Sequence, residues 1–416
     1  MSTYSTRVDQ FKKILTEDKL DLHQLRQLCF NGIPDIAWIR PLAWRLLLGY
    51  LPTKRSGWDN ILKAKRDLYD SFLDDIIINP SLAADDENEG DHLHDVNDHP
   101  LSLDPESQWV TYFKDNEVLS QIDKDARRLY PDMSFFQKAT EFPCKKKGSQ
   151  ALRKRVEKTV LLESKVTTNR QGVQKIKNKS KDQEYHTLSE GEEAHWEVVE
   201  RMLFIYAKLN PGIGYVQGMN EIMGPIYYIF AVDSNSEWKR YAECDAFFCF
   251  TNLMAENRDN FIRTLDNSVC GIGFWMQRVC QSIRYKDSAV WQVLEDKGIR
   301  PEFYCFRWFT LLLSQEFPLP DVIRIWDSLF AEENRFEFLL CVCCAMLMWV
   351  PPVVKNNLIM SVHFKKLTYD FTDYLNSLVR DEILQGEFAD IIKTLQNYPV
   401  SDVHIILKKA AELRGM

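Results

Sequence analysis

The chain contains 416 residues, of which 45% are hydrophobic and 12% aromatic, so it can bury the core of one large or two ordinary domains. Its formal net charge of −8 argues against a general nucleic-acid-binding protein, because such proteins carry a basic surface. The 10 cysteines follow no regular framework and most stand in apolar stretches, which is typical of reduced core residues in a cytosolic protein.

The first part of the chain predicts helices separated by one distinctive turn. Residues 1–30 predict two short polar helices, and Gly32-Ile33-Pro34 then predicts a turn. A helical face follows that carries Arg40 and Trp44 one turn apart. This pattern suits either a functional motif or a buried tryptophan with its arginine stacked on it.

A further helix is predicted from Trp58 to Ile78, and the apolar residues then become sparse. From Asn79 to about Ser107 we expect a solvated acidic loop. Its carboxylates and histidines suggest a metal site, but an EF-hand register that begins at Asp85 places Val96 where a bidentate glutamate is required. We therefore expect no metal in this loop.

The stretch from Asn116 to Pro131 predicts an amphipathic helix that the proline ends. Asp125 precedes Arg128 by one turn, so we expect an ion pair that orients the guanidinium, although such pairs are also common on surfaces without a function. Arg127 lies about 100° round the helix from Arg128, and we expect it to face solvent. The core-facing residues recur every three or four positions, at Val118, Leu119, Ile122, Ala126 and Leu129.

The middle of the chain contains a basic segment and then two strong helices. Residues 144–193 favour a solvated linker, with attraction to an anionic membrane or an acidic partner as the alternative. A helix is predicted from Trp196 to Asn210, where Pro211 ends it. The next helix begins near Gly218, which places Gln217 at or just before an amino terminus whose amide groups favour an anion such as phosphate.

The carboxy-terminal half predicts further helices, and the whole sequence lacks sustained period-two patterning, so we expect an all-α fold. The longest apolar run, Phe338 to Val350, is shorter than the about 20 residues that span a bilayer, and we expect a buried helix there. We find no secretory signal, no amino-terminal Met-Gly and no carboxy-terminal prenylation box. Membrane contact would therefore come through a partner.

Four spaced patterns occur together along the chain. They are Gly32-Ile33-Pro34 with Arg40 and Trp44; IxxDxxR as Ile122, Asp125 and Arg128; YxQ as Tyr215 and Gln217, continuing to Asn220; and Arg324-Ile325-Trp326-Asp327. In this order, over roughly residues 25–410, the chain resembles the TBC-domain family of Rab GTPase-activating proteins. The resemblance implies a helical lead-in over residues 1–30 and one large multi-helix domain of two helical lobes over residues 31–410, with charged loop insertions at about 79–107 and 144–193.

By this resemblance Arg128 is an arginine finger that neutralises charge on the transferring phosphoryl group, and Gln217 is a glutamine finger that orients the attacking water. The partner is a Rab-family GTPase in its GTP form. It carries the nucleotide and Mg²⁺, so we expect no cofactor or metal in this chain and no independent hydrolase activity. We expect a cytoplasmic protein of vesicle trafficking, and the basic segment leaves peripheral membrane contact open. The residues given supporting roles are Ile122, Asp125, Tyr215, Asn220, Arg40 and Trp44.

The alternative from another class is a non-catalytic all-α scaffold that binds a Rab or another trafficking partner. The presence of both Arg128 and Gln217 favours catalysis, because a scaffold needs neither. A metal- or thiol-dependent enzyme has no supporting constellation, since Cys341, Cys343 and Cys344 lack ligand spacing.

One stretch departs from the family pattern. In the family, the helix that contains Met346-Leu347-Met348 runs on without a long break into a sequence like the one that begins at Val379. Here the residues from Trp349 to Leu378 intervene, and Pro351-Pro352 interrupts any helix. Our hypothesis is an atypical insertion at about 349–378 that loops out or disrupts the carboxy-terminal packing.

Overall fold

The regular secondary structure of the protein is helical in the residues that the structure describes. The computed structural model describes residues 2–77, 107–146, 152, 156, 188–189, 191–262, 271–348, 383–399 and 402–415. Within these ranges every regular element is a helix, and the extended backbone is limited to two isolated bridges, between Lys19 and Lys54 and between Ala139 and Ala194. The expected all-α fold is confirmed.

The chain forms two compact units. Unit 1 comprises Met1–Ser56 and Asn252–Met416, and unit 2 comprises Gly57–Thr251. Helix α11 (Ala242–Asn257) contributes residues to both units. Arg128 and Gln217 belong to unit 2, whereas Arg40 and Trp44 belong to unit 1.

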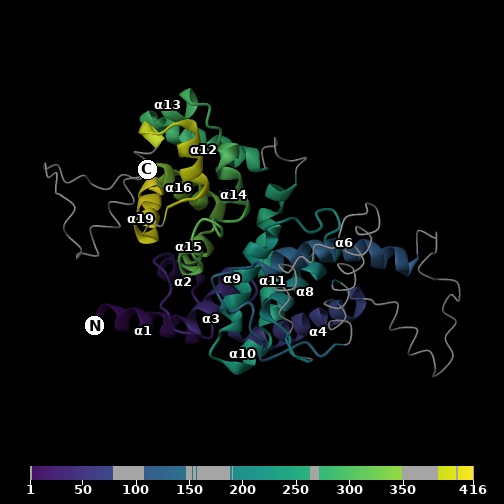
Figure 1. The fold of residues 1–416 in the computed structure, drawn as a ribbon. Helices are drawn as coiled ribbons and strands as arrows, with labels where there is room; N and C mark the ends of the chain where they lie inside the picture. The colour runs from purple at the N-terminus through teal and green to yellow at the C-terminus, as the bar shows by residue number, and fades with distance from the viewer. Residues whose placement is uncertain are drawn as a thin grey trace, which may run out of the picture. The chain divides into compact units, whose positions relative to one another are not determined.

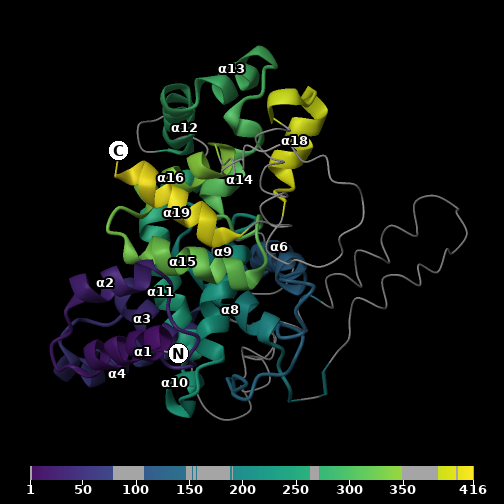
Figure 2. The ribbon, with the colours of Figure 1, turned by 90° about the vertical axis from the view of Figure 1, so that its left-hand side faces the viewer.

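Unit 1 is built around helix α16 (Arg335–Met348), most of whose side chains are buried. The buried helix expected from Phe338 onward is thus confirmed as far as Met348. Helix α19 (Val403–Arg414) lies along α16 in both views (Figures 1 and 2). The other α-helices of this unit are α1 (Ser2–Thr16), α2 (Leu22–Phe30), α3 (Ile39–Leu47), α12 (Ile272–Lys286), α13 (Ser288–Asp296), α14 (Cys305–Thr310), α15 (Leu319–Ala331) and α18 (Phe388–Gln396).

Unit 2 is organised by two long helices that run antiparallel, α6 (Gln108–Arg127) and α8 (His195–Leu209). At one end the Arg127 guanidinium lies over the Trp196 ring, and at the other end Lys208 Nζ lies 2.7 Å from Asp115 Oδ1. The remaining α-helices of this unit are α4 (Trp58–Ile76), α9 (Met219–Ala231), α10 (Ser236–Arg240) and the first part of α11.

Helix α6 begins and ends earlier than the sequence pattern predicted. Its amino terminus is capped by Ser107, whose Oγ accepts a hydrogen bond of 3.1 Å from the Trp109 amide. Its last helical residue is Arg127, and Tyr130 adopts a positive φ of 44° before Pro131. The chain has therefore left the helix before the proline that we expected to end it.

Three expected insertions lie largely or wholly outside the described residues. These are the acidic segment 79–107, the basic segment 144–193 and the atypical segment 349–378. In the part of the chain that the structure describes, no helix is long and apolar enough to cross a membrane. Nine of the ten cysteines are described, and all nine are free thiols. Burial raises the pKa of the Cys305 and Cys343 thiols, which keeps them protonated.

Candidate functional site

Arg128 is the residue that follows the last turn of α6, and its side chain is exposed. The expected ion pair with Asp125 is wrong. The backbone amide of Arg128 donates to the Asp125 carbonyl at 3.2 Å, but the carboxylate of Asp125 accepts its hydrogen bond from another residue, Tyr215. Among the described residues, no side chain forms a hydrogen bond or ion pair with the Arg128 guanidinium.

Asp125 instead joins the end of α6 to the segment before α9. The Tyr215 hydroxyl donates to Asp125 Oδ2 at 2.7 Å, and Asn220 Nδ2 donates to the Asp125 carbonyl at 3.2 Å. Burial and the neighbouring Asp125 carboxylate raise the pKa of the Tyr215 hydroxyl, so it stays protonated as a donor. The structure thus brings three of the expected supporting residues together.

Gln217 lies immediately before Gly218, and its side chain is exposed. Gly218 has a φ of 101°, a left-handed conformation that glycine adopts without strain, and α9 begins at Met219. The expected helix start near Gly218 is confirmed. Gly218 has no side chain, so this residue provides no side-chain cap for the first turn of α9. No partner for the Gln217 amide occurs within the ranges that the structure describes.

A second contact fixes the two segments on each other through apolar groups. Leu129, which follows Arg128, is fully buried against α9 at Gly224. A Cβ atom added to Gly224 would lie 2.7 Å from Leu129 Cδ2 and 3.2 Å from its Cγ. The supporting residue Ile122 is also fully buried, on the core face of α6. The backbone on both sides of Arg128 is therefore anchored while its side chain is exposed.

A Gly224→Ala variant should be less stable than the wild type. Alanine favours a helix over glycine by about 1 kcal/mol, but overpacking a buried site typically costs about 1–3 kcal/mol, and Leu129 is fully buried, with its Cγ as well as its methyl groups too close to the added Cβ. We expect a lower midpoint in urea denaturation. Gly212→Ala is the matched control, because nothing lies within 4 Å of a Cβ there. Equal midpoints for the two variants would contradict the packing argument.

The prediction that Arg127 faces solvent is wrong. Its side chain is 16% exposed, and its Nε lies 2.9 Å from both carboxylate oxygens of the buried Asp123. The guanidinium also lies over the Trp196 ring. The spacing of four residues between Asp123 and Arg127 was visible in the sequence, but Trp196 comes from another helix, and sequence reasoning missed that contact.

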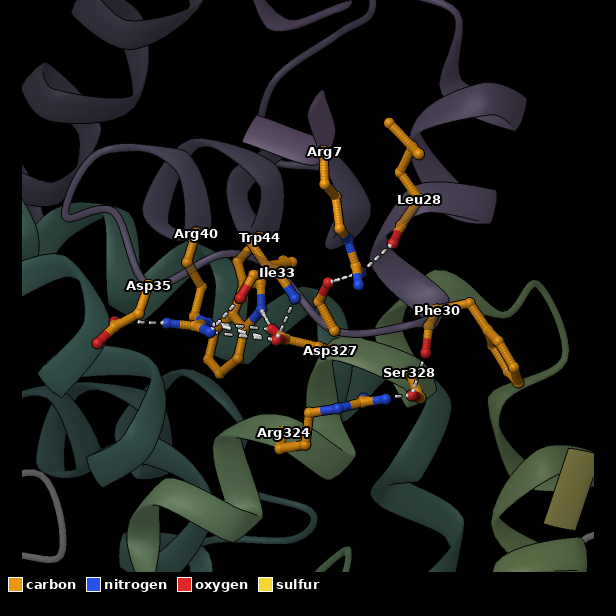
Figure 3. A network of polar contacts seen from close by, with 11 residues as sticks. Arg7, Leu28, Phe30, Ile33, Asp35, Arg40, Trp44, Arg324, Asp327 and Ser328 are labelled. Atoms are coloured by element: carbon orange, nitrogen blue, oxygen red, sulfur yellow. Dashed lines mark hydrogen bonds and ion pairs between the residues drawn. The ribbon is translucent and has the colours of Figure 1, made fainter. Parts of the chain in front are cut away.

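Arg40 and Trp44 meet at the buried carboxylate of Asp327 in unit 1 (Figure 3). Trp44 Nε1 and the Ile33 amide each donate to Asp327 at 2.9 Å, and Arg40 Nε lies 3.3 Å from Oδ1. Burial raises the pKa of Asp327, and these donors oppose that shift. Arg40 and Trp44 therefore stabilise the packing of α3 with α15 and are structural residues of this unit.

Gly32 lies beside the same network, at a position where a side chain would not fit. It has a φ of +88°, and a Cβ there would lie 2.7 Å from Arg324 Nε. Arg324 Nη1 in turn donates to Ser328 Oγ at 2.8 Å, and that hydroxyl donates to the Phe30 carbonyl at 2.6 Å (Figure 3). The Gly-Ile-Pro turn and the Arg-Ile-Trp-Asp pattern are thus two halves of one structural cluster.

The comparisons with known proteins agree with this architecture. The family model of the Rab-GTPase-TBC domain matches residues 139–353. TBC1 domain family member 13 of Homo sapiens is 51% identical over 426 residues, which cover 99% of this chain and 99% of that protein. The Mus musculus protein of the same name matches equally well, at 51% identity over 426 residues. This chain belongs to the Rab-GTPase-TBC domain family.

A solved structure has a fold similar to that of this chain. The crystal structure of the Ypt/Rab-GAP domain of Gyp1p is similar with a TM-score of 0.62 and 20% identity, over 99% of each chain. At that identity the likeness concerns the fold alone. The TBC family model begins after Arg128 and includes Gln217, so of the two candidate fingers it covers only the second.

Proposed function

We propose that this TBC-domain protein accelerates GTP hydrolysis by a Rab-family GTPase, with Arg128 and Gln217 entering the partner's nucleotide site. One observation carries the proposal. Two exposed polar side chains without described partners project from segments that are fixed to each other by Asp125, Tyr215 and Asn220 and by Leu129 on Gly224. A fixed backbone with an unengaged side chain is what a residue acting on another molecule requires.

Arg128 supplies positive charge where negative charge develops. Small GTPases hydrolyse GTP slowly because charge builds on the phosphoryl oxygens and the attacking water is poorly oriented. The planar guanidinium can donate two hydrogen bonds to neighbouring phosphate oxygens at once. Arg128 follows the carboxy terminus of α6, and the negative end of the helix dipole favours a cation there in the unbound protein.

Gln217 orients the attacking water. Its amide offers one acceptor oxygen and two donor hydrogens, which match a water that must be held and aimed at phosphorus. The left-handed Gly218 turns the chain directly after Gln217, so the glutamine is displayed at the start of α9 and does not become part of the helix. We assign the nucleotide and Mg²⁺ to the partner, and a cytoplasmic role in vesicle trafficking to the protein.

Phosphate release from a panel of GTP-loaded Rab proteins tests this function. The wild type is expected to accelerate at least one Rab, and Gln217→Ala to remove most of that acceleration while the protein stays folded. Gln121→Ala is the matched control, because Gln121 is an exposed glutamine of α6 outside the proposed site. If the wild type binds one GTP-loaded Rab and accelerates none, the protein is a non-catalytic scaffold and the proposal is wrong.

A further inference from the structure

Arg127 and Arg128 are adjacent in sequence but have opposite environments. The Arg128 side chain is exposed, whereas the Arg127 side chain is 16% exposed and held by other groups. Both arginines lie at the point where α6 ends. Arg127 is held in place, and the neighbouring Arg128 extends its side chain into solvent. This difference suggests that the two arginines have different roles.

Groups from two helices hold the Arg127 guanidinium, among them Asp123 and Trp196. Asp123, one turn earlier on α6, offers both carboxylate oxygens at 2.9 Å from Nε, and the centre of the Trp196 ring lies 4.1 Å from Cζ. Trp196 stands in the first turn of α8. The side chain of Arg127 therefore connects the last turn of α6 to the first turn of α8.

Buried carboxyl groups lie around this contact, and a cation beside them compensates for their charge. Asp123 is 2% exposed in its side chain, and Glu200 of α8 is fully buried nearby. Burial, and next the Asp123 charge, raise the pKa of Glu200, while Arg127 acts in the opposite direction. Other charged groups of α8 that face this carboxyl are Glu197 and Arg201. Without Arg127, the Asp123 carboxylate would face another buried carboxyl with less compensation.

The backbone that joins the two arginines is also held. Gln137 Nε2 donates to the Arg127 carbonyl at 3.0 Å, and the Arg128 amide donates to the Asp125 carbonyl at 3.2 Å. These two bonds engage the carbonyl and the amide of the same peptide bond. With the Arg127 side chain fixed as well, the Cα of Arg128 has little freedom to shift.

We propose that Arg127 is a positioning residue, whose clamp on Asp123 and Trp196 sets the point from which the Arg128 side chain reaches the partner. The inference rests on the proposed function for the role of Arg128. The position that the end of a long side chain can occupy depends on the position of its Cα. A displacement of about 1 Å at a reacting group can cost about 10²-fold in rate. Arg127 itself does not touch the nucleotide.

The Arg127→Lys variant tests this role in the full-length protein. Lysine keeps the charge beside Asp123 but cannot place a planar guanidinium over the Trp196 ring. With the Rab that the wild type accelerates most, we expect kcat to fall about 10- to 100-fold while Kd for the GTP-bound Rab stays unchanged. Lys124→Ala is the control, since Lys124 is exposed on the same turn. An unchanged kcat in Arg127→Lys would overturn the proposal.

A double variant separates positioning from stability. Arg127→Gln leaves the buried Asp123 without its cation and should lower Tm, whereas Asp123→Asn with Arg127→Gln removes both charges and should restore much of it. If Arg127 positions the finger, kcat stays low in the double variant because the stack on Trp196 is still missing. If kcat recovers together with Tm, Arg127 serves stability alone and the proposal is wrong.

Amide hydrogen exchange gives a readout that needs no partner. In Arg127→Lys we expect faster exchange confined to residues 126–130, with α8 and the first turns of α6 unchanged. Exchange at the wild-type rate, or an increase spread over both helices, would overturn the proposal. The two hypotheses fail differently: the proposed function fails if the wild type accelerates no Rab, and the positioning role fails if Arg127→Lys exchanges like the wild type.

Discussion

An Arg128→Ala variant is expected to lower kcat for its Rab by about 10³-fold or more, because arginine fingers contribute about 10³–10⁵ to GTP hydrolysis in Ras-type systems. Such a factor corresponds to about 4–7 kcal/mol of barrier. Kd for the GTP-bound Rab should change much less, since the finger acts on charge that develops in the transition state. Single-turnover phosphate release measures the first quantity, and a binding titration with a non-hydrolysable GTP analogue measures the second.

The exposed position of Arg128 means that Arg128→Ala should change the rate with little effect on stability. Arg128 is exposed and has no hydrogen-bond or ion-pair partner for its guanidinium among the described residues, so alanine removes only its weak attraction to the end of the helix dipole and Tm should change little. Arg128→Lys keeps the charge without the fork, and we expect only a small part of the rate to return. A loss of affinity equal to the loss of rate would show that Arg128 is a binding contact only, which contradicts the finger role.

The second large effect is expected in unit 1, where Asp327→Ala should destabilise the fold by about 3–5 kcal/mol. Alanine would leave three buried or partly buried donors without their acceptor: the Ile33 amide, Trp44 Nε1 and the Arg40 guanidinium (Figure 3). Urea denaturation followed by tryptophan fluorescence measures the loss.

Asp35→Ala is the matched control for Asp327. Asp35 also pairs with Arg40, at 3.3 Å, but its side chain is 98% exposed, so solvent screens the pair and we expect little change in stability. If the two variants lost similar stability, Asp327 would not be the centre of the cluster. The wild-type rate of GTP hydrolysis by the partner should persist in Asp35→Ala.

The sequence was sufficient for the fold class and for the start of α9. Apolar residues at helical spacing occur throughout, and local signals such as Gly218 before Met219 mark a helix start that the structure confirms. These features depend on residues close together in the chain. The end of α6 was predicted less well. We expected Pro131 to end the helix, but its last helical residue is Arg127.

The candidate site could be predicted only in part, because its key contacts join distant segments. We expected the Asp125 carboxylate to pair with Arg128, one turn away. It instead accepts a hydrogen bond from Tyr215, which lies 90 positions later in the sequence. Arg127 was expected in solvent because Trp196, its stacking partner, lies on another helix. Local spacing shows which residues can meet on one helix, and it does not show which distant group competes for them.

The two candidate fingers therefore have different support. Both are exposed in the structure, and both stand on segments anchored through Asp125, Tyr215 and Asn220. Membership of the Rab-GTPase-TBC domain family supports a GTPase as the partner, while the roles of Arg128 and Gln217 remain our proposal. Arg127, which sequence reasoning placed in solvent, becomes part of the structural support of the site.

The most direct test of the two-finger proposal is the binding of each Rab of the panel loaded with GDP and aluminium fluoride, which mimics the transferring phosphoryl group. Gel filtration would follow complex formation by the wild type, Arg128→Ala and Gln217→Ala. We predict that the wild type forms a stable complex with at least one Rab only when fluoride is present, and that neither variant does. A complex that forms equally without fluoride, or equally with both variants, would contradict the proposed role of the two fingers.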